Sequence, residues 1–270
     1  MNFYEKLNAV WQKNDSMVCV GLDPDVAKLP PCCRDAEYPL FAFNKQIIDA
    51  TFDLVCAYKP QAAYYAGQDA DDELAMTIEY IKSAYPDIPV ILDVKRGDIG
   101  ATAELYAREA FVRYAADAVT VNPYMGQDAL APFLDYADRG VIILCRTSNP
   151  GGSDLQSLIA DGKPIYEHVA ELARDRYNYN NNVALVIGAT YPEELSRIRK
   201  IAPELPFLVP GVGAQGGDVA KVLENGCTAD GYGLIINSSR GIIYAGKGDD
   251  FAEAARNATI ELRDLIRNCK

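Results

Sequence analysis

Short apolar runs rich in β-branched residues alternate with amphipathic stretches along the 270 residues of the chain. Runs of the first kind are typical of buried strands, and apolar residues spaced three or four apart are typical of helices that cover a sheet. The predicted strands are Val18–Leu22, Leu54–Tyr58, Val90–Val94, Ala118–Val121, Val141–Cys145, Ala184–Ile187, Phe207–Val209 and Gly233–Ile236. The clearest helices between them are Phe41–Phe52, Asp72–Ala84, Thr102–Ala115, Pro164–Tyr177, Glu193–Ile201 and Val219–Glu224.

This alternation predicts an α/β fold, a closed (β/α)8 barrel. Strands that alternate with helices form a parallel sheet, and eight such units in about 250 residues match the barrel in count and length. Two helices remain: Phe3–Lys13 is expected to close the barrel floor, and Phe251–Arg267 to be the eighth outer helix, with Leu262, Leu265 and Ile266 on its apolar side. Because the chain has no linker or internal repeat, residues 1–270 are predicted to form one domain.

Polar residues collect where the predicted strands end, which is the edge that carries the active site in this fold. They include Asp23 after the first strand, Lys59 after the second, Arg146-Thr147-Ser148-Asn149 after the fifth, and Asn237-Ser238-Ser239-Arg240 after the eighth. The sequence therefore predicts a charged site at the carboxyl edge of the barrel.

The third strand carries the most informative segment, Asp93-Val-Lys95-Arg-Gly-Asp98. Alternate residues of a strand face the same side, so Asp93 and Lys95 are expected to meet, with Asp98 just beyond the strand end. Opposed charges at this distance keep the ammonium protonated and the carboxylates ionised. Such a cluster suits proton delivery to a carbon beside an anionic group, although an ordinary structural ion pair explains the three residues equally well.

Glycines after the seventh strand, followed by the Val219–Glu224 helix, predict a phosphate site to which Arg240 adds a charged contact. The segment Gly211–Gly216 also fits the dinucleotide pattern G-x-G-x-x-G. Its expected acid, Asp230, precedes the next strand, whereas a ribose-binding acid follows one, so a nicotinamide site is rejected.

Composition narrows the class of protein. The chain is 49% hydrophobic and 24% charged, without an apolar run long enough for a membrane span. A net charge of −12 argues against nucleic acid and anionic membranes as partners. Seven cysteines without metal-ligand spacing, together with an N-terminus unlike a signal peptide, predict a cytoplasmic protein. His168 is the one histidine and lies in a helical pattern, so neither a histidine-based triad nor a histidine metal site has support.

Several strand ends carry motifs that are specific in combination. The third has Asp93-x-Lys95-x-x-Asp98-Ile99, and the others have Leu22-Asp23, Lys59, Thr147-Ser148-Asn149, Pro210-Gly211-Val212-Gly213 and Ser239-Arg240. In these motifs the chain resembles the orotidine 5′-phosphate decarboxylase family over nearly its whole length. Arg96-Gly97 and the run Gly213–Gly217 are similar to the longer bacterial subgroup.

The resemblance implies decarboxylation of orotidine 5′-monophosphate to uridine 5′-monophosphate and CO2 in pyrimidine biosynthesis, without a metal or an organic cofactor. It implies a catalytic Lys59-Asp93-Lys95-Asp98 array in which Lys95 protonates the ring carbon. It further implies that Asp23 binds a ribose hydroxyl, that Ser148 binds an edge of the pyrimidine, and that Gly213, Gln215 and Arg240 bind the phosphate.

In this family the second aspartate and a nearby threonine come from a partner subunit. The resemblance therefore implies a homodimer in which Asp98 and Thr102 reach the partner's site. Pro150–Lys163 is unusually long for a loop between a barrel strand and its helix, and we hypothesise that it acts as a lid.

Two other functions stay open. A sugar-phosphate synthase or decarboxylase of the same barrel group would keep the Asp-x-Lys-x-x-Asp motif but require Mg2+. A non-catalytic uridine-phosphate binder would keep the phosphate loops, but it has no need for carboxylates beside an anionic ligand.

Overall fold

Eight parallel strands form a barrel in the computed structural model, which describes residues 1–212 and 218–269. The order is β2-β1-β10-β9-β8-β5-β4-β3, and every neighbouring pair is parallel. The strands are β1 Val18–Leu22, β2 Ala57–Pro60, β3 Ile91–Arg96, β4 Ala118–Val121, β5 Gly140–Arg146, β8 Val183–Ile187, β9 Phe207–Pro210 and β10 Leu234–Ser238.

The two ends of this sheet meet between β2 and β3. Parallel bridges join Tyr58 to Val90 and Gln61 to Asp93, so the sheet closes on itself. The predicted (β/α)8 barrel is confirmed. Buried aliphatic side chains of Val, Ile and Leu dominate the strands, as expected for a parallel sheet covered on its outer side.

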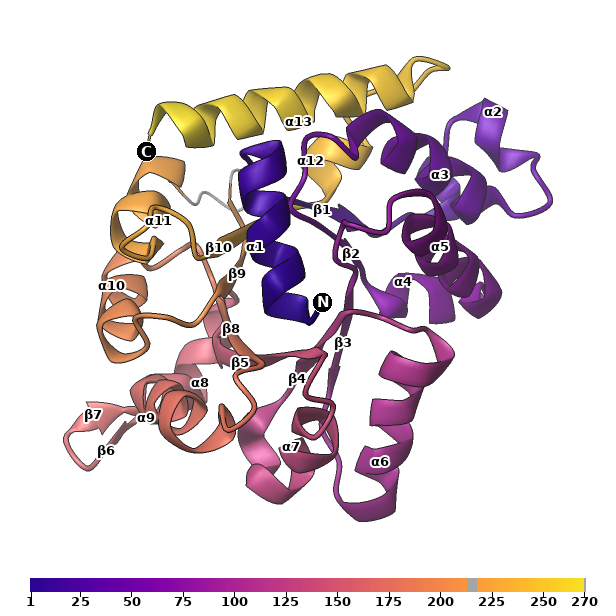
Figure 1. Cartoon of the computed structure of the whole chain (residues 1–270). Helices are drawn as coiled ribbons and strands as arrows, with labels where there is room; N and C mark the ends of the chain where they lie inside the picture. Colours follow the sequence, from indigo (N-terminus) through magenta and orange to yellow (C-terminus); the bar gives the residue numbers. More distant parts are fainter. Residues whose placement is uncertain (213–217, 270) are drawn as a thin grey trace.

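Helices surround the ring of strands (Figure 1). The longer ones are α3 Pro39–Thr51, α5 Asp71–Ala84, α6 Gly100–Arg108, α7 Gln127–Leu134, α9 Ile165–Leu172, α10 Pro192–Ile201, α11 Val219–Gly226 and α13 Phe251–Asn268. Shorter ones are α2 Pro31–Arg34, α4 Ala62–Ala66, α8 Ser153–Gln156 and α12 Arg240–Ile243. Single π-helical turns extend α6 and α9, at η2 Glu109–Arg113 and η5 Ala173–Tyr177, and 3-10 turns occur at η1 Val26–Lys28, η3 Pro123–Met125 and η4 Pro150–Gly152.

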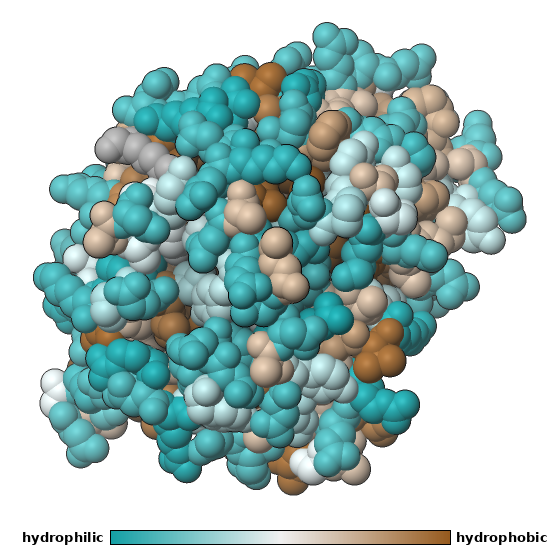
Figure 2. Space-filling model, viewed as in Figure 1, coloured by the Kyte–Doolittle hydropathy of each residue, from teal (hydrophilic) through white to brown (hydrophobic). Residues whose placement is uncertain are grey.

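The first helix, α1 Phe3–Asn14, closes the amino-terminal end of the barrel, as predicted. In Figure 1 it lies in the middle of the ring of strands. Phe3 packs against Gly140 at the start of β5, where an added Cβ would lie 2.4 Å from the Phe3 ring. Lys6 forms an ion pair of 3.0 Å with the buried Asp117, just before β4. The same face is mostly hydrophilic on its outside (Figure 2), because the polar side of α1 is turned to solvent.

Beyond shifts of one or two residues at element ends, the structure differs from the sequence-based prediction in the following details. The second strand begins at Ala57 rather than Leu54, because Leu54 and Val55 are buried in the turn before it. Leu265 is 48% exposed, since the buried side of α13 follows the spacing Ala255, Thr259 and Ile266 instead. The segment after β5 is also not a plain loop, since it contains α8 and a small hairpin of β6 Ile159–Ala160 and β7 Lys163–Pro164.

No helix within the described part of the chain is long and apolar enough to span a membrane.

Candidate active site

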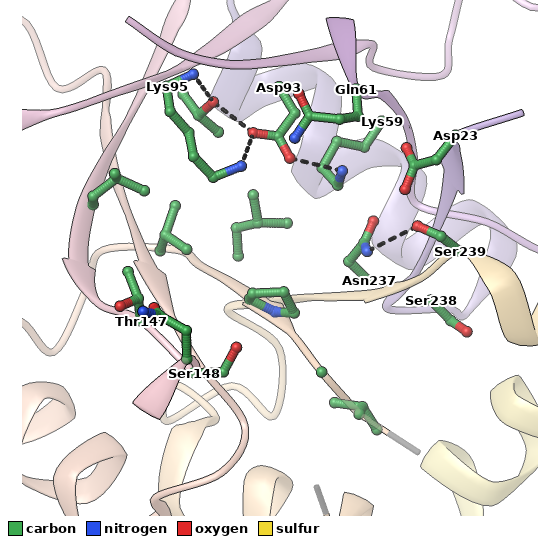
Figure 3. Close-up of a pocket in the computed structure, with 18 of the residues that line it drawn as sticks. Asp23, Lys59, Gln61, Asp93, Lys95, Thr147, Ser148, Asn237, Ser238 and Ser239 are labelled. Atoms are coloured by element: carbon green, nitrogen blue, oxygen red, sulfur yellow. Dashed lines mark hydrogen bonds and ion pairs between the residues drawn. The ribbon is translucent and has the colours of Figure 1, made fainter. Parts of the chain in front are cut away.

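Two lysines share one carboxylate at the carboxyl edge of the barrel. The Asp93 carboxylate, on β3, accepts from Lys59 Nζ at 2.9 Å through one oxygen and from Lys95 Nζ at 2.7 Å through the other. Figure 3 shows the three side chains in this arrangement at one side of a pocket. The expected meeting of Asp93 and Lys95 is confirmed.

Regular alternation of side chains along β3 does not explain why Asp93 and Lys95 meet. The pairing of β3 with β4 shifts register between Leu92 and Arg96, and Lys95 has a φ of 51°, in the left-handed region. A left-handed lysine inside a strand is uncommon and is found where the surroundings impose it, often at functional sites. The backbone therefore takes an uncommon conformation at Lys95, the residue expected to protonate the ring carbon.

Burial strengthens the electrostatic attraction between Lys59 and Asp93. The Lys59 side chain is 5% exposed and that of Asp93 is 8% exposed, whereas that of Lys95 is 43% exposed. Burial alone would raise the pKa of Asp93, but the charges of Lys59 and Lys95 outweigh it and hold that pKa well below its usual range. Burial likewise opposes the charge on Lys59, yet Asp93 and Asp23 raise its pKa above the ordinary lysine value. Lys59 and Asp93 are therefore both charged at neutral pH.

The charged group opens into a cavity of about 530 Å3 at the carboxyl ends of the strands. Polar side chains around it come from β2, β3, β4 and β10 and from the segments that follow β1, β2, β5 and β10. An apolar wall comes from Leu144, Val186 and Leu208 on β5, β8 and β9. In Figure 3, Thr147 and Ser148 lie across the pocket from Asp93 and Lys59. A planar, partly polar ligand could thus lie between the charged group and the β5 edge.

The residues singled out from the sequence fall into three groups. Asp23, Lys59, Asp93, Lys95, Ser148 and Arg240 all line the cavity. Gly213 and Gln215 lie outside the described residues, so the expected phosphate contacts there have no structural description. The described residues around the cavity do not include Asp98 or Thr102.

Among the described residues, Asp98 and Thr102 make no contact with the lysines of their own cavity. The Asp98 carboxylate accepts a hydrogen bond from the following Ile99 amide at 2.8 Å, and Thr102 is exposed near the start of α6. Neither forms an ion pair or a hydrogen bond with Lys95 among the described residues. Within one chain, Asp93 and Lys95 of the cluster inferred from spacing are therefore paired, and Asp98 is not part of this group.

Two acceptor oxygens in the cavity have no partner among the described residues. They are Asp23 Oδ1, just after β1, and Asn237 Oδ1 on β10, both almost inaccessible. Buried acceptors without a partner are costly in a folded protein, and a ligand hydroxyl or N–H satisfies them. Asn237 was noted in the sequence only as part of the polar run after the eighth strand, and Gln61, which follows β2, was not singled out. Gln61 stands in no recognisable motif, and closure of the barrel brings it to the cavity.

The long segment after β5 is tied to the barrel by polar contacts. The side-chain oxygen of Gln156, in α8, accepts from the Thr147 amide at 2.9 Å and from Arg146 at 3.1 Å. Arg146 is almost fully buried and also contacts Glu194 at the start of α10. These contacts hold α8 against the β5 strand end, next to Ser148.

Within the described residues, no group of three or more His, Cys, Asp and Glu side chains is placed to hold a metal ion. His168 bonds through Nε2 to the Ala160 carbonyl at 2.8 Å, which joins α9 to the hairpin.

A (β/α)8 barrel with a buried lysine–aspartate pair at its carboxyl edge and a half-apolar cavity beside it has the form of an enzyme of the barrel class. Comparison with known proteins makes this specific. Residues 16–257 match the model of the "Orotidine 5'-phosphate decarboxylase / HUMPS family". The chain belongs to this family, as its motifs predicted.

Curated relatives that are named orotidine 5′-phosphate decarboxylase align with nearly the full length of this chain. Orotidine 5′-phosphate decarboxylase of Cupriavidus necator is 58% identical over 266 residues, covering 98% of both chains. That of Cellvibrio japonicus is also 58% identical, over 268 residues and 98% of both chains. The predicted enzyme class, a decarboxylase of this family, is confirmed.

Solved structures share the barrel. Leishmania donovani OMP decarboxylase has a TM-score of 0.86 at 39% identity, covering 100% of this chain and 98% of that one. The UMP synthase of the same organism has a TM-score of 0.88 at 41% identity, and this chain corresponds to 56% of its length.

Proposed function

We propose that this protein converts orotidine 5′-monophosphate to uridine 5′-monophosphate and CO2 in pyrimidine biosynthesis, in the cytoplasm and without a cofactor. The observation that carries the proposal is the buried Lys59–Asp93 pair that holds Lys95 on the wall of the cavity. Family membership and full-length relatives that bear this activity in their names support it.

The chemistry requires fixed charges. When the bond between the ring carbon and the carboxylate breaks, the electron pair stays on a carbon that has no carbonyl to accept it. Charges already in place stabilise such a pair without reorganisation. As this bond breaks, CO2 departs and the partly exposed Lys95 ammonium stabilises the electron pair left on the ring carbon. Lys95 then gives that carbon a proton, and a proton from solvent restores the ammonium.

Asp93 and Lys59 set the position and charge of Lys95. Asp93 is ionised because its pKa is depressed. Its carboxylate lies beside the carboxylate of the bound substrate, and repulsion between the two charges raises the free energy of the bound substrate more than that of the product, which lacks that carboxylate. Asp23 binds a ribose hydroxyl through its partnerless oxygen, and Ser148 binds the pyrimidine edge. Arg240, at the start of α12, binds the phosphate together with Gly213 and Gln215.

Purified protein incubated with orotidine monophosphate, with and without excess EDTA, tests this function. We expect the substrate absorbance to decay equally in both samples, with uridine monophosphate as product. No conversion by folded protein would contradict the proposal. EDTA-sensitive turnover of a sugar phosphate would instead indicate the synthase branch of the barrel group.

The second part of the proposal is a homodimer in which Asp98 and Thr102 enter the partner's cavity. Several large apolar side chains near these residues in the chain are exposed: Leu105 on α6 by 61%, Val112 on η2 by 60%, and Tyr124 on η3 by 79%. Leu105 and Val112 line one shallow groove. Exposed apolar side chains that share a surface are typical of protein interfaces.

Mixing two inactive variants tests the shared site. In a dimer of Lys95→Ala with Asp98→Ala, one cavity has the intact Lys95 of one chain and the intact Asp98 of the other. After subunit exchange at equal amounts, we expect about a quarter of the wild-type number of active sites, because half of the dimers are mixed and each has one intact site. Absence of any recovery in confirmed mixed dimers would show that each chain supplies its own Asp98.

A further inference from the structure

We propose that Thr120 is the positioning residue for Lys95, holding both its backbone and its carboxylate partner through one hydroxyl group. Thr120 lies on β4, is 1% exposed and borders the cavity. The inference deepens the proposed decarboxylation, because it concerns how the proton donor is placed.

The need for such a residue follows from the pairing of β3 with β4. Leu92 pairs with Val119, and Arg96 is the next residue of β3 to pair, with Val121. Three residues of β3, 93 to 95, therefore lie opposite Thr120 alone. Extra residues of a bulge are left outside the ladder, so their amide groups require other partners.

Thr120 supplies that partner. Its Oγ1 accepts from the amides of Val94 and Lys95, each at 3.0 Å. It donates its own proton to Asp93 Oδ1 at 2.8 Å. A hydroxyl has one proton to donate and two lone pairs to accept with, so its full bonding capacity is used by these three residues.

The same Asp93 oxygen also accepts from Lys95 Nζ, at 2.7 Å. The Thr120 hydroxyl thus holds Lys95 at both ends, directly at its amide and through Asp93 at its ammonium. This matters because the Lys95 side chain is 43% exposed and its φ is 51°, so neither packing nor backbone preference fixes its direction. Without the hydroxyl, the bulge has no acceptor for two amides and the carboxylate loses one of its donors.

The test compares Thr120→Val, which keeps the shape, with Thr120→Ser, which keeps the hydroxyl. Thr259→Val is the matched control, because Thr259 is also fully buried but, among the described residues, bonds to the Ala255 carbonyl inside α13 alone and does not line the cavity. For Thr120→Val we expect kcat to fall about 10- to 100-fold, the effect of losing a hydrogen bond to a charged group. KM should change little, since ribose and phosphate contacts are made elsewhere. Thr120→Ser and Thr259→Val should keep nearly wild-type kcat.

Hydrogen exchange of a peptide containing Val94 and Lys95 gives a readout that does not depend on turnover. Exchange should be faster in Thr120→Val than in the wild type, and slow in Thr120→Ser. If Thr120→Val lowers the melting temperature but keeps both the wild-type kcat and slow exchange, Thr120 is an ordinary core residue and the proposal is wrong. If the wild type itself does not act on orotidine monophosphate, the proposed function fails, and the exchange data still decide whether Thr120 fixes the Lys95 backbone.

Discussion

Gly188, just after β8, lies against the backbone of Ser148: a Cβ on Gly188 would be 2.8 Å from the Ser148 amide nitrogen and 2.9 Å from its Cα. Backbone atoms cannot rotate away as the end of a side chain can, so only glycine allows Ser148 to take its place on the cavity wall. This contact links two neighbouring strands at the edge where the pyrimidine is proposed to bind.

Gly188→Ala should therefore displace Ser148 and weaken substrate binding. We expect KM for orotidine monophosphate to rise about tenfold, the loss of roughly one hydrogen bond, with a smaller effect on kcat. Gly151→Ala is the control, because its Cβ would make only ordinary contacts of 3.6 Å and longer at the same edge of the barrel. Unchanged kinetics in Gly188→Ala would show that Ser148 does not bind substrate.

Lys95→Ala should abolish decarboxylation, by at least about 1000-fold, because it removes both the charge that stabilises the carbanion and the proton. Binding of uridine monophosphate, measured by calorimetry, should persist, since the phosphate contacts remain. Lys13→Ala, which removes a lysine that is 65% exposed and paired at the surface, serves as control. Near-normal turnover in Lys95→Ala would assign the proton to another donor.

Asp93→Asn should destabilise the fold, because it leaves the buried Lys59 without its charged partner. Breaking a buried pair from one side costs about 3 kcal/mol or more, whereas an exposed pair is worth about 1 kcal/mol or less. Urea unfolding should show this contrast between Asp93→Asn and Asp87→Asn, since Asp87 pairs with Lys13 at the surface with 66% exposure. Equal effects of the two substitutions would mean that the Lys59–Asp93 pair is well solvated.

The same pair predicts how stability depends on pH. The pKa of Asp93 is depressed in the folded state, so its contribution is present above the unfolded value of about 3.9 and is lost as pH falls through the folded value. The pKa of Lys59 is raised, so its contribution is complete below about 10.4 and is lost only as pH rises through the folded value. The difference in unfolding free energy between wild type and Asp93→Asn should thus be constant from about pH 5 to 9 and shrink below about pH 4. A difference that already declines near pH 6 would contradict the depressed pKa.

The barrel could be predicted from the sequence because each of its strands is a short apolar run and each long helix has a periodic apolar side. Boundaries were less predictable where tertiary packing outweighs periodicity. Leu54 and Val55 have strand-like side chains but are buried in a turn, and Leu265 lies off the buried side of α13.

Within the site, Asp93 and Lys95 were predictable because neighbours in sequence stay neighbours in a strand. Thr120 was not, since one polar residue in an apolar strand gives no sign of what lies opposite it, and Asn237 was recognised only as one of several polar residues at a strand end. Their roles depend on register between strands, which the sequence does not state. The same holds for the direction of Asp98, which a spacing of five residues from Asp93 leaves open.

The irregular pairing of β3 has a consequence for changes in chain length. Loss or gain of one residue between Leu92 and Arg96 would turn either Asp93 or Lys95 to the opposite face of the barrel wall. Val94 lies between Asp93 and Lys95 and packs against the core, so its substitution would leave both side chains on their present face of the barrel wall. Insertions and deletions should therefore be far more damaging here than replacements.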